Sequence, residues 1–286
     1  MKQFVHLHVH SNFSLLDGLP SPSMLARAAR AKGMEALALT DHGTMGGIFK
    51  FWQACRREGV KPLLGSELYF VDDVDDHRVR KTAHLTVIAR NAKGWRNLCK
   101  LSTASFVSGK FYLPRIDWKM LERWSEGLIV LSGCIQGRVQ SSVLAGDVAA
   151  AREYYDRMTE LTGGQFFIEY MPLAFSEQLV LNELLLPFIE EVGAQAVVTN
   201  DAHYLNREDR ELYPLIMLAQ TQGRIHSEVS NAWLKTRREL CETLNVVYPD
   251  VPRAFLTEAM DRTVEIAQSV TNFEIDTSNK YPEYIA

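Results

Sequence analysis

The stretch Phe4-Val5-His6-Leu7-His8-Val9-His10 decides the fold prediction, because it joins a β-strand pattern to three histidines. Alternate side chains of a strand share a face, so His6, His8 and His10 are expected to point the same way. Imidazoles on one face of a core strand are costly unless each is hydrogen-bonded or bound as a ligand. The alternative is one core histidine with two surface histidines. We favour ligation, which places a functional site beside this strand.

Outward from this stretch, short apolar runs alternate with longer segments of helical periodicity. Strands are predicted at residues 4–8, 36–40, 63–70, 85–89, 128–132, 166–170 and 196–199. Helices are predicted at residues 21–32, 45–58, 94–106, 147–161, 177–191, 208–220 and 252–270. Seven strands with intervening helices indicate a parallel α/β architecture, most simply a barrel.

Composition excludes several classes of protein. The 286 residues are 47% hydrophobic and 23% charged, which is typical of a globular chain. The net charge of −4 argues against a protein that coats duplex DNA, but it allows a small site for a few phosphates. No apolar run is long enough to span a membrane, and the N-terminus lacks a signal-peptide pattern, so we expect a cytoplasmic protein.

Side chains that can bind metals lie within or directly after several of the predicted strands. They are Asp17, Asp41, His42, Glu67, Cys134, Asp201 and His203. The carboxyl ends of barrel strands converge on one mouth, which would bring these distant residues together with the first strand's histidines. The four cysteines include no CxxC pair, which argues against a zinc knuckle or a disulfide framework. Imidazoles, carboxylates and one thiolate suit Zn²⁺, Mn²⁺ or Fe²⁺ better than Ca²⁺.

The number of candidates indicates the chemistry. They exceed the needs of one ion and suffice for two or three ions with open positions. Such a site suits the hydrolysis of phosphate esters, because bound water becomes hydroxide near neutral pH while neighbouring ions hold the phosphate oxygens. The chain has no G-x-S-x-G elbow, Walker A loop or dinucleotide fingerprint that would point to another chemistry.

These motifs resemble the PHP (polymerase and histidinol phosphatase) superfamily. The segments that carry the resemblance are His8-Val9-His10-Ser11, Thr40-Asp41-His42-Gly43, Gly65-Ser66-Glu67, His84-Leu85-Thr86, Leu131-Ser132-Gly133-Cys134 and Thr199-Asn200-Asp201-Ala202-His203-Tyr204. The text between them, including Ser14-Leu15-Leu16-Asp17-Gly18 and Gly59-Val60-Lys61-Pro62, looks most like the N-terminal PHP domain of bacterial DNA polymerase III alpha subunits.

The resemblance implies a distorted seven-stranded β/α barrel over residues 1–275, followed by a tail or linker at 276–286. It implies three divalent ions, Zn²⁺ or Mn²⁺ first, with Fe²⁺ or Mg²⁺ as alternatives. One ion would be held by His8, His10, Glu67 and Asp201, and a second by Asp17, His42 and His203. Glu67, His84 and Cys134 would hold the third; His84 enters mainly on the resemblance, because it starts its predicted strand.

The implied activity is metal-dependent 3′–5′ exonuclease proofreading by a metal-bound hydroxide, with a DNA 3′ end as substrate. The implied partners are the remaining polymerase regions and other replisome subunits. All nine ligand positions are filled, whereas some polymerase members of the family have lost several. The polymerase palm is absent, and the tail fits an excised domain slightly better than a free-standing relative.

Two other functions stay open. The domain could be a docking module that bound metals stabilise, or a small-molecule phosphatase similar to histidinol phosphatase.

Several single residues also stay open. Asp41 either orients an imidazole or caps the following helix, and Glu169 is a weaker candidate for the same vicinity. We interpret His6 as a satisfied buried histidine outside the ligand set. The basic loop Arg78–Lys81 is either solvated or a contact for a nucleic-acid backbone.

Overall fold

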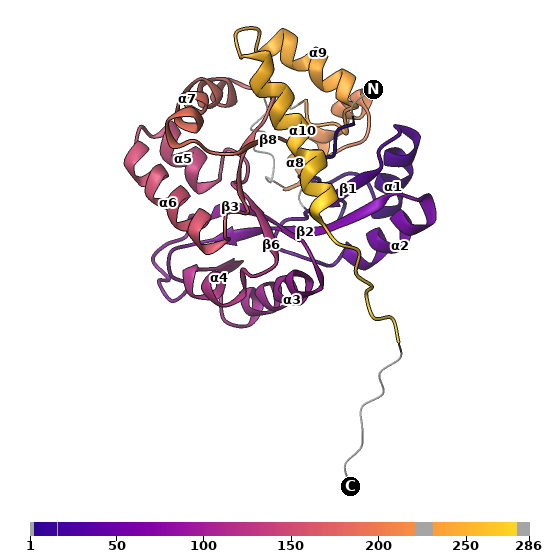
Figure 1. Ribbon diagram of the computed structural model, residues 1–286. Helices are drawn as coiled ribbons and strands as arrows, with labels where there is room; N and C mark the ends of the chain where they lie inside the picture. Colours follow the sequence, from indigo (N-terminus) through magenta and orange to yellow (C-terminus); the bar gives the residue numbers. More distant parts are fainter. Residues whose placement is uncertain (1–2, 16, 221–230, 279–286) are drawn as a thin grey trace.

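One curled sheet forms the centre of the molecule, with helices around it (Figure 1). The computed structural model describes residues 3–15, 17–220 and 231–278. The strand order is β4-β5-β2-β3-β6-β7-β8, and β1 pairs with the other part of β2. The strands are β1 (Ala36–Leu39), β2 (Lys61–Phe70), β3 (Ala83–Ala89), β4 (Lys110–Phe111), β5 (Leu113–Ile116), β6 (Leu128–Leu131), β7 (Phe166–Tyr170) and β8 (Ala196–Val198).

The N-terminal segment joins the two ends of this sheet. On one side, the Ala38 amide donates to His6 O at 3.0 Å and the Thr40 amide donates to Val9 O at 2.9 Å. On the other side, the amide of Ala202, just after β8, donates to His8 O at 3.1 Å. The segment is not a regular strand, but it takes the place of a seventh barrel strand between β1 and β8. The predicted distorted seven-stranded barrel is thereby confirmed.

The prediction that all strands are parallel was wrong for β3. This strand runs antiparallel to both of its neighbours, β2 and β6. The connection from β2 to β3, residues 71–82, contains no helix, and a direct return without a crossover gives an antiparallel pair. The start of β3 therefore lies beside the end of β2, with His84 opposite Tyr69. This explains how a residue that begins its strand reaches the same end of the barrel as residues that follow theirs.

Helices cover the outside of the barrel (Figure 1). The sequence predicted the longer ones and missed the short elements β4, β5, α4 and α5, as well as α9; the predicted helix at 208–220 is divided into η1 and α8. The helices are α1 (Pro22–Ala31), α2 (Ile48–Glu58), α3 (Ala92–Val107), α4 (Trp118–Trp124), α5 (Arg138–Leu144), α6 (Val148–Leu161), α7 (Ser176–Val192), the 3₁₀ helix η1 (Arg207–Glu211), α8 (Tyr213–Gln220), α9 (Arg237–Val247) and α10 (Arg253–Ser269).

The barrel interior is apolar at one end. Leu7, Ala38, Leu63 and Val197 pack there in a cluster that includes Ile266 from α10. Helix α10 thus covers this end, and the polar side chains gather at the other. Among the described residues, no helix is long and apolar enough to cross a membrane. Residues 221–230, and residues 279–286 of the predicted tail, lie outside the described residues.

Candidate metal centre

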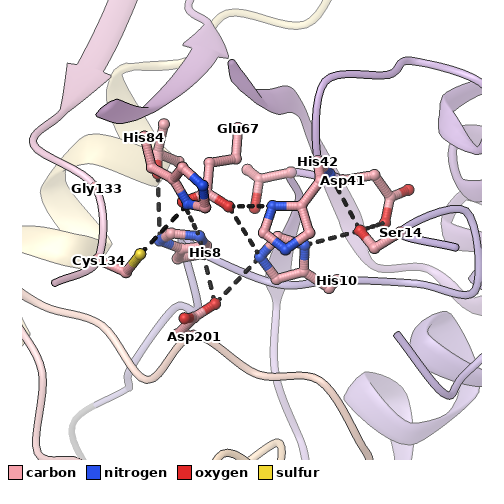
Figure 2. Close-up of polar contacts among 12 residues, drawn as sticks. His8, His10, Ser14, Asp41, His42, Glu67, His84, Gly133, Cys134 and Asp201 are labelled. Atoms are coloured by element: carbon pink, nitrogen blue, oxygen red, sulfur yellow. Dashed lines mark hydrogen bonds and ion pairs between the residues drawn. The ribbon is translucent and has the colours of Figure 1, made fainter. Parts of the chain in front are cut away.

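The nine predicted ligand residues meet at the polar end of the barrel, and Figure 2 shows most of them. Each comes from an element that the fold carries to this end. The N-terminal segment carries His8 and His10, and the loop after it carries Asp17. Strand β2 carries Glu67, and β3 carries His84. The segment after β1 carries His42, the segment after β6 carries Cys134, and the segment after β8 carries Asp201 and His203.

Glu67 is the centre of the cluster. Its Oε2 lies 2.6 Å from Nδ1 of His42 and 3.5 Å from Nε2 of His10. Its Oε1 lies 2.9 Å from Nδ1 of His84 and 3.4 Å from Nε2 of His8. The carboxylate is only 1% exposed, so these four imidazoles take the place of water around it. One carboxylate with two oxygens facing different histidines is suited to bridge two ions.

Asp201 faces the same two N-terminal histidines from below Glu67 in the view of Figure 2. Its Oδ1 lies 3.1 Å from Nε2 of His10 and 3.4 Å from Nε2 of His8. The backbone of Asp201 has φ +44°, a left-handed conformation that few residues other than glycine adopt. An uncommon backbone conformation at a side chain aimed into a polar cluster is typical of functional positions.

The remaining three residues lie at the edges of the cluster. Asp17 Oδ2 lies 3.1 Å from Nε2 of His42 and 3.7 Å from Nε2 of His203. Nδ1 of His203 lies 2.7 Å from the backbone oxygen of Asp201, which leaves its Nε2 to face Asp17. The Cys134 thiol lies 3.4 Å from Nδ1 of His84, on the side away from His42.

The cluster fits divalent metal ions, because several of its buried polar atoms face one another at close range without the alignment of a hydrogen bond. Such atoms are Nε2 of His8 and His10, Nδ1 of His42, and one carboxylate oxygen each of Asp17, Glu67 and Asp201. Burying so many unsatisfied atoms together is costly unless a ligand satisfies them. Three groups of three have ligand atoms mutually within 4.8 Å: His8, His10 and Asp201; His10, His42 and His203; and His42, Glu67 and His84. These groups only partly coincide with the three sets that the family resemblance implies.

Charges within the cluster counteract the effect of burial. Burial alone would raise the pKa of Glu67, but His84, His8 and His42 hold it well below its usual value. Burial alone would lower the pKa of His8, but Glu169, Asp201 and Glu67 raise it well above. Burial, with Glu67 and Asp201 adding to it, raises the pKa of the Cys134 thiol well above its usual value. Glu67 is therefore ionised, which is the form in which a carboxylate binds a cation.

The pKa of His10 shifts in the opposite direction from those of His8, His42 and His203. Burial, followed by the charges of His42 and His203, lowers its pKa to about 3. Its ring is stacked on that of His203, with centroids 4.3 Å apart. The lowered pKa keeps the His10 ring neutral.

The prediction that His6 points the same way as His8 and His10 was wrong. A bend at His8 interrupts the alternation of the segment. Leu7 packs in the barrel interior, whereas Val9 packs with Leu37 and Leu39 on the opposite face of the sheet. Nε2 of His6 lies 2.7 Å from the backbone oxygen of Lys235, away from the cluster. The interpretation of His6 as a buried histidine outside the ligand set agrees with this geometry, but the ring is satisfied at Nε2 alone, because Nδ1 has no hydrogen-bond partner among the described residues.

Glu169, only a weak candidate in the sequence, directly orients a cluster residue. Its Oε2 lies 2.8 Å from Nδ1 of His8 and accepts a hydrogen bond from Thr199 Oγ1 at 2.6 Å. Its Oε1 accepts from the Gly133 amide at 2.9 Å. A carboxylate behind a histidine fixes which ring nitrogen faces the metal. The sequence signal for this role was the place of Glu169 near the end of a strand predicted to be parallel.

Asp41 acts on a histidine of the cluster indirectly, through one intervening residue. Its carboxylate accepts hydrogen bonds from the Ser11 amide at 2.7 Å and from the Ser14 hydroxyl at 2.9 Å. The Ser14 hydroxyl lies 2.8 Å from Nδ1 of His10. Asp41 therefore does not cap α2, which begins only at Ile48, and it orients an imidazole through Ser14. No sequence signal marked Ser14.

A distorted barrel with a histidine and carboxylate cluster at one end is typical of metal-dependent hydrolases. A family profile described as "PHP domain" matches residues 6–172, more than half of the chain. The chain belongs to the PHP domain family.

Its curated relatives are DNA polymerase III alpha subunits. That of Borreliella burgdorferi is 35% identical over 285 residues, which is 96% of this chain and 24% of the relative. That of Aquifex aeolicus is 36% identical over 248 residues, which is 83% of this chain and 21% of the relative. The chain thus spans about a quarter of the length of these relatives.

Among solved structures, a Bifidobacterium adolescentis protein described as a metal-dependent phosphoesterase matches 71% of this chain and 88% of its own. The TM-score is 0.39 and the identity 16%, so the family assignment rests on the sequence comparison.

Proposed function

We propose that this chain is a metal-dependent phosphoesterase that removes nucleotides from DNA 3′ ends, as a 3′–5′ exonuclease within a DNA polymerase III alpha subunit. The observation that carries the proposal is the complete set of nine ligand-competent residues, several of whose buried polar atoms face one another without the alignment of hydrogen bonds. Divalent ions, when bound, lower the pKa of coordinated water and polarise phosphate oxygens. The relatedness to polymerase subunits supports DNA as the substrate and the rest of the polymerase as the partner.

Within the proposal, each residue has a defined task. His8, His10, Glu67 and Asp201 hold one ion, Asp17, His42 and His203 a second, and Glu67, His84 and Cys134 a third. Zn²⁺ and Mn²⁺ suit this mixture of imidazole, carboxylate and thiolate ligands best. Glu169 and Asp41 keep His8 and His10 in their orientations by the hydrogen bonds described above.

Two measurements on the purified chain test the proposal. Elemental analysis is expected to find about three transition-metal ions per chain, the number that the ligand set can hold. A single-stranded oligonucleotide labelled at its 3′ end is expected to lose labelled nucleotide with Mn²⁺ or Zn²⁺, and His10→Ala is expected to abolish this release. No release with any divalent metal, or equal release by His10→Ala, would contradict the exonuclease.

The same experiment separates the two other functions. Bound metals whose removal lowers the melting temperature, without hydrolysis of any substrate, would indicate a metal-stabilised docking module. Turnover of a small phosphomonoester without action on DNA would indicate a small-molecule phosphatase.

A further inference from the structure

A rim of aromatic and basic side chains lies beside the candidate metal centre. It consists of the loop at residues 71–82 and the hairpin of β4 and β5, and we call it the aromatic–basic rim. β5 pairs with the end of β2, so that Arg115 lies opposite Tyr69, two residues beyond Glu67. A side chain at Gly43, directly after His42, would meet Tyr69 and Pro114 of the hairpin. The rim therefore adjoins the mouth of the barrel.

The rim is a built structure, because one buried arginine ties its two parts together. Arg115 is 1% exposed. Its guanidinium donates to the backbone oxygens of Val74 and Val79 in the loop, at 2.6 and 3.2 Å, and to that of Gly109 before the hairpin, at 3.1 Å. Because this buried guanidinium donates hydrogen bonds to three carbonyl groups, it holds the loop and the hairpin in one arrangement.

The aromatic groups of the rim are presented outward. Tyr112, at the hairpin turn, is 71% exposed and has φ +62°, one of two such non-glycine residues among those described. An exposed bulky residue in this uncommon conformation is typical of a functional position. The Arg80 guanidinium lies over its ring at 5.3 Å. Beside it, the rings of His77 and Phe111 are stacked, with centroids 4.7 Å apart and planes within 6°.

The charge of the rim is locally positive despite the acidic chain. Three of its four aspartates are paired: Asp76 with Arg78 at 2.8 Å, Asp73 with Lys119 at 3.5 Å, and Asp72 with Arg138 at 2.9 Å. Arg80, Lys81 and Lys110 have no ion pair within the described part of the chain and are exposed, so they exceed the one remaining acid, Asp75.

We propose that the aromatic–basic rim binds the single-stranded DNA that leads to the metal centre, with a base stacked on Tyr112 and the phosphates near Arg80, Lys81 and Lys110. Aromatic platforms alternating with cations are the usual means of binding single strands without sequence preference. The proposal rests on the proposed function, since it concerns the same substrate. The proposal also gives the basic loop Arg78–Lys81 a role: Arg78 pairs with Asp76, while Arg80 and Lys81 face the DNA.

The test measures the binding of a fluorescent oligothymidine by anisotropy, in chelator so that no hydrolysis occurs. Tyr112→Gly is expected to bind about tenfold more weakly, the typical cost of losing one base–aromatic stack, and Tyr112→Phe is expected to bind normally. Tyr112→Gly removes the unfavourable conformation, so its melting temperature should not fall. Arg80→Gln should reduce the slope of log affinity against log salt by about 0.7, and the matched variant Arg57→Gln on α2 should not.

Normal binding by both Tyr112→Gly and Arg80→Gln, or no binding by the unaltered chain, would overturn the proposal. A second assay compares the hydrolysis of the oligonucleotide with that of a dinucleotide too short to reach the rim. Tyr112→Gly should slow only the former. Binding that depends on Tyr112 without any hydrolysis would leave the rim in place and contradict the exonuclease.

Discussion

The two ends of the barrel interior come from the same strands yet differ in chemistry. In the N-terminal segment, Leu7 packs in the apolar end and the next residue, His8, faces the cluster; in β2, Leu63 and Glu67 divide in the same way. The apolar end gains free energy from burial without any ligand. The polar end gathers ionised groups and polar atoms without aligned hydrogen bonds, and bound cations would stabilise the folded state there. Stability and function are thus separated along one barrel axis.

The largest effect expected at the polar end comes from Glu67→Gln. This change removes the carboxylate that four imidazoles share, so bound metal should fall and hydrolysis should drop by about a thousandfold or more. Elemental analysis and release of 3′ nucleotides measure the two effects. Glu35→Gln, at an exposed position, is the matched control. A Glu67→Gln variant with its full metal content and rate would show that the polar end does not depend on this carboxylate.

At the apolar end, Leu7→Ala should act on stability alone. Leu7 is fully buried, so truncation should lower the free energy of unfolding by about 3 kcal/mol. Urea unfolding should show the same loss with metal and with chelator, and the metal content of the folded chain should stay unchanged. If the variant lost metal as well, the two ends would be coupled through His8 and the separation would be wrong.

A smaller effect is expected behind the ligands. Glu169→Gln weakens the partner of His8 without removing a ligand, so metal affinity should fall by about 10- to 100-fold. Competition with a chelator measures this affinity, and Glu183→Gln on the exposed face of α7 is the control. Equal affinity in both variants would mean that Thr86 Oγ1, 3.2 Å from Nδ1 of His8, is enough to orient the ring.

The sequence predicted the barrel, and the meeting of the ligand residues other than His84, because short apolar runs and the residues at their ends are local signals. His84 entered mainly on the family resemblance. It did not predict the direction of β3, which depends on a connection without a helix, or the bend at His8, which turns His6 away from the cluster. It also could not identify Ser14 and Lys235, because a serine and a lysine gain their roles only from neighbours distant in sequence. Local sequence patterns thus predict the fold, whereas the orientation of the ligand side chains depends on long-range contacts.

The smallest expected effect concerns Lys235, a buried charge with hydrogen-bonding partners, in contrast to the polar atoms of the metal cluster. Lys235 is fully buried; its ammonium donates to Asn200 Oδ1 at 2.9 Å and to Asn231 O, and lies over the Trp233 ring. Burial lowers its pKa to about 7. The unfolded chain keeps this proton up to about pH 10, so it binds more protons than the folded chain above pH 7 and folding stability should rise with pH.

For the unaltered chain, the expected contribution of Lys235 is a rise of about 1 kcal/mol between pH 7 and 8. Lys235→Met should lose this rise even where its stability at pH 7 is lower, and Lys61→Met, at a half-exposed position, should keep it. Urea unfolding across this pH range measures the difference. Parallel pH profiles for Lys235→Met and the unaltered chain would mean that Asn200, Asn231 and Trp233 keep the ammonium charged throughout. That result would show that hydrogen-bonding partners alone can keep a buried group charged. The metal cluster would then need cations because its polar atoms lack aligned hydrogen bonds.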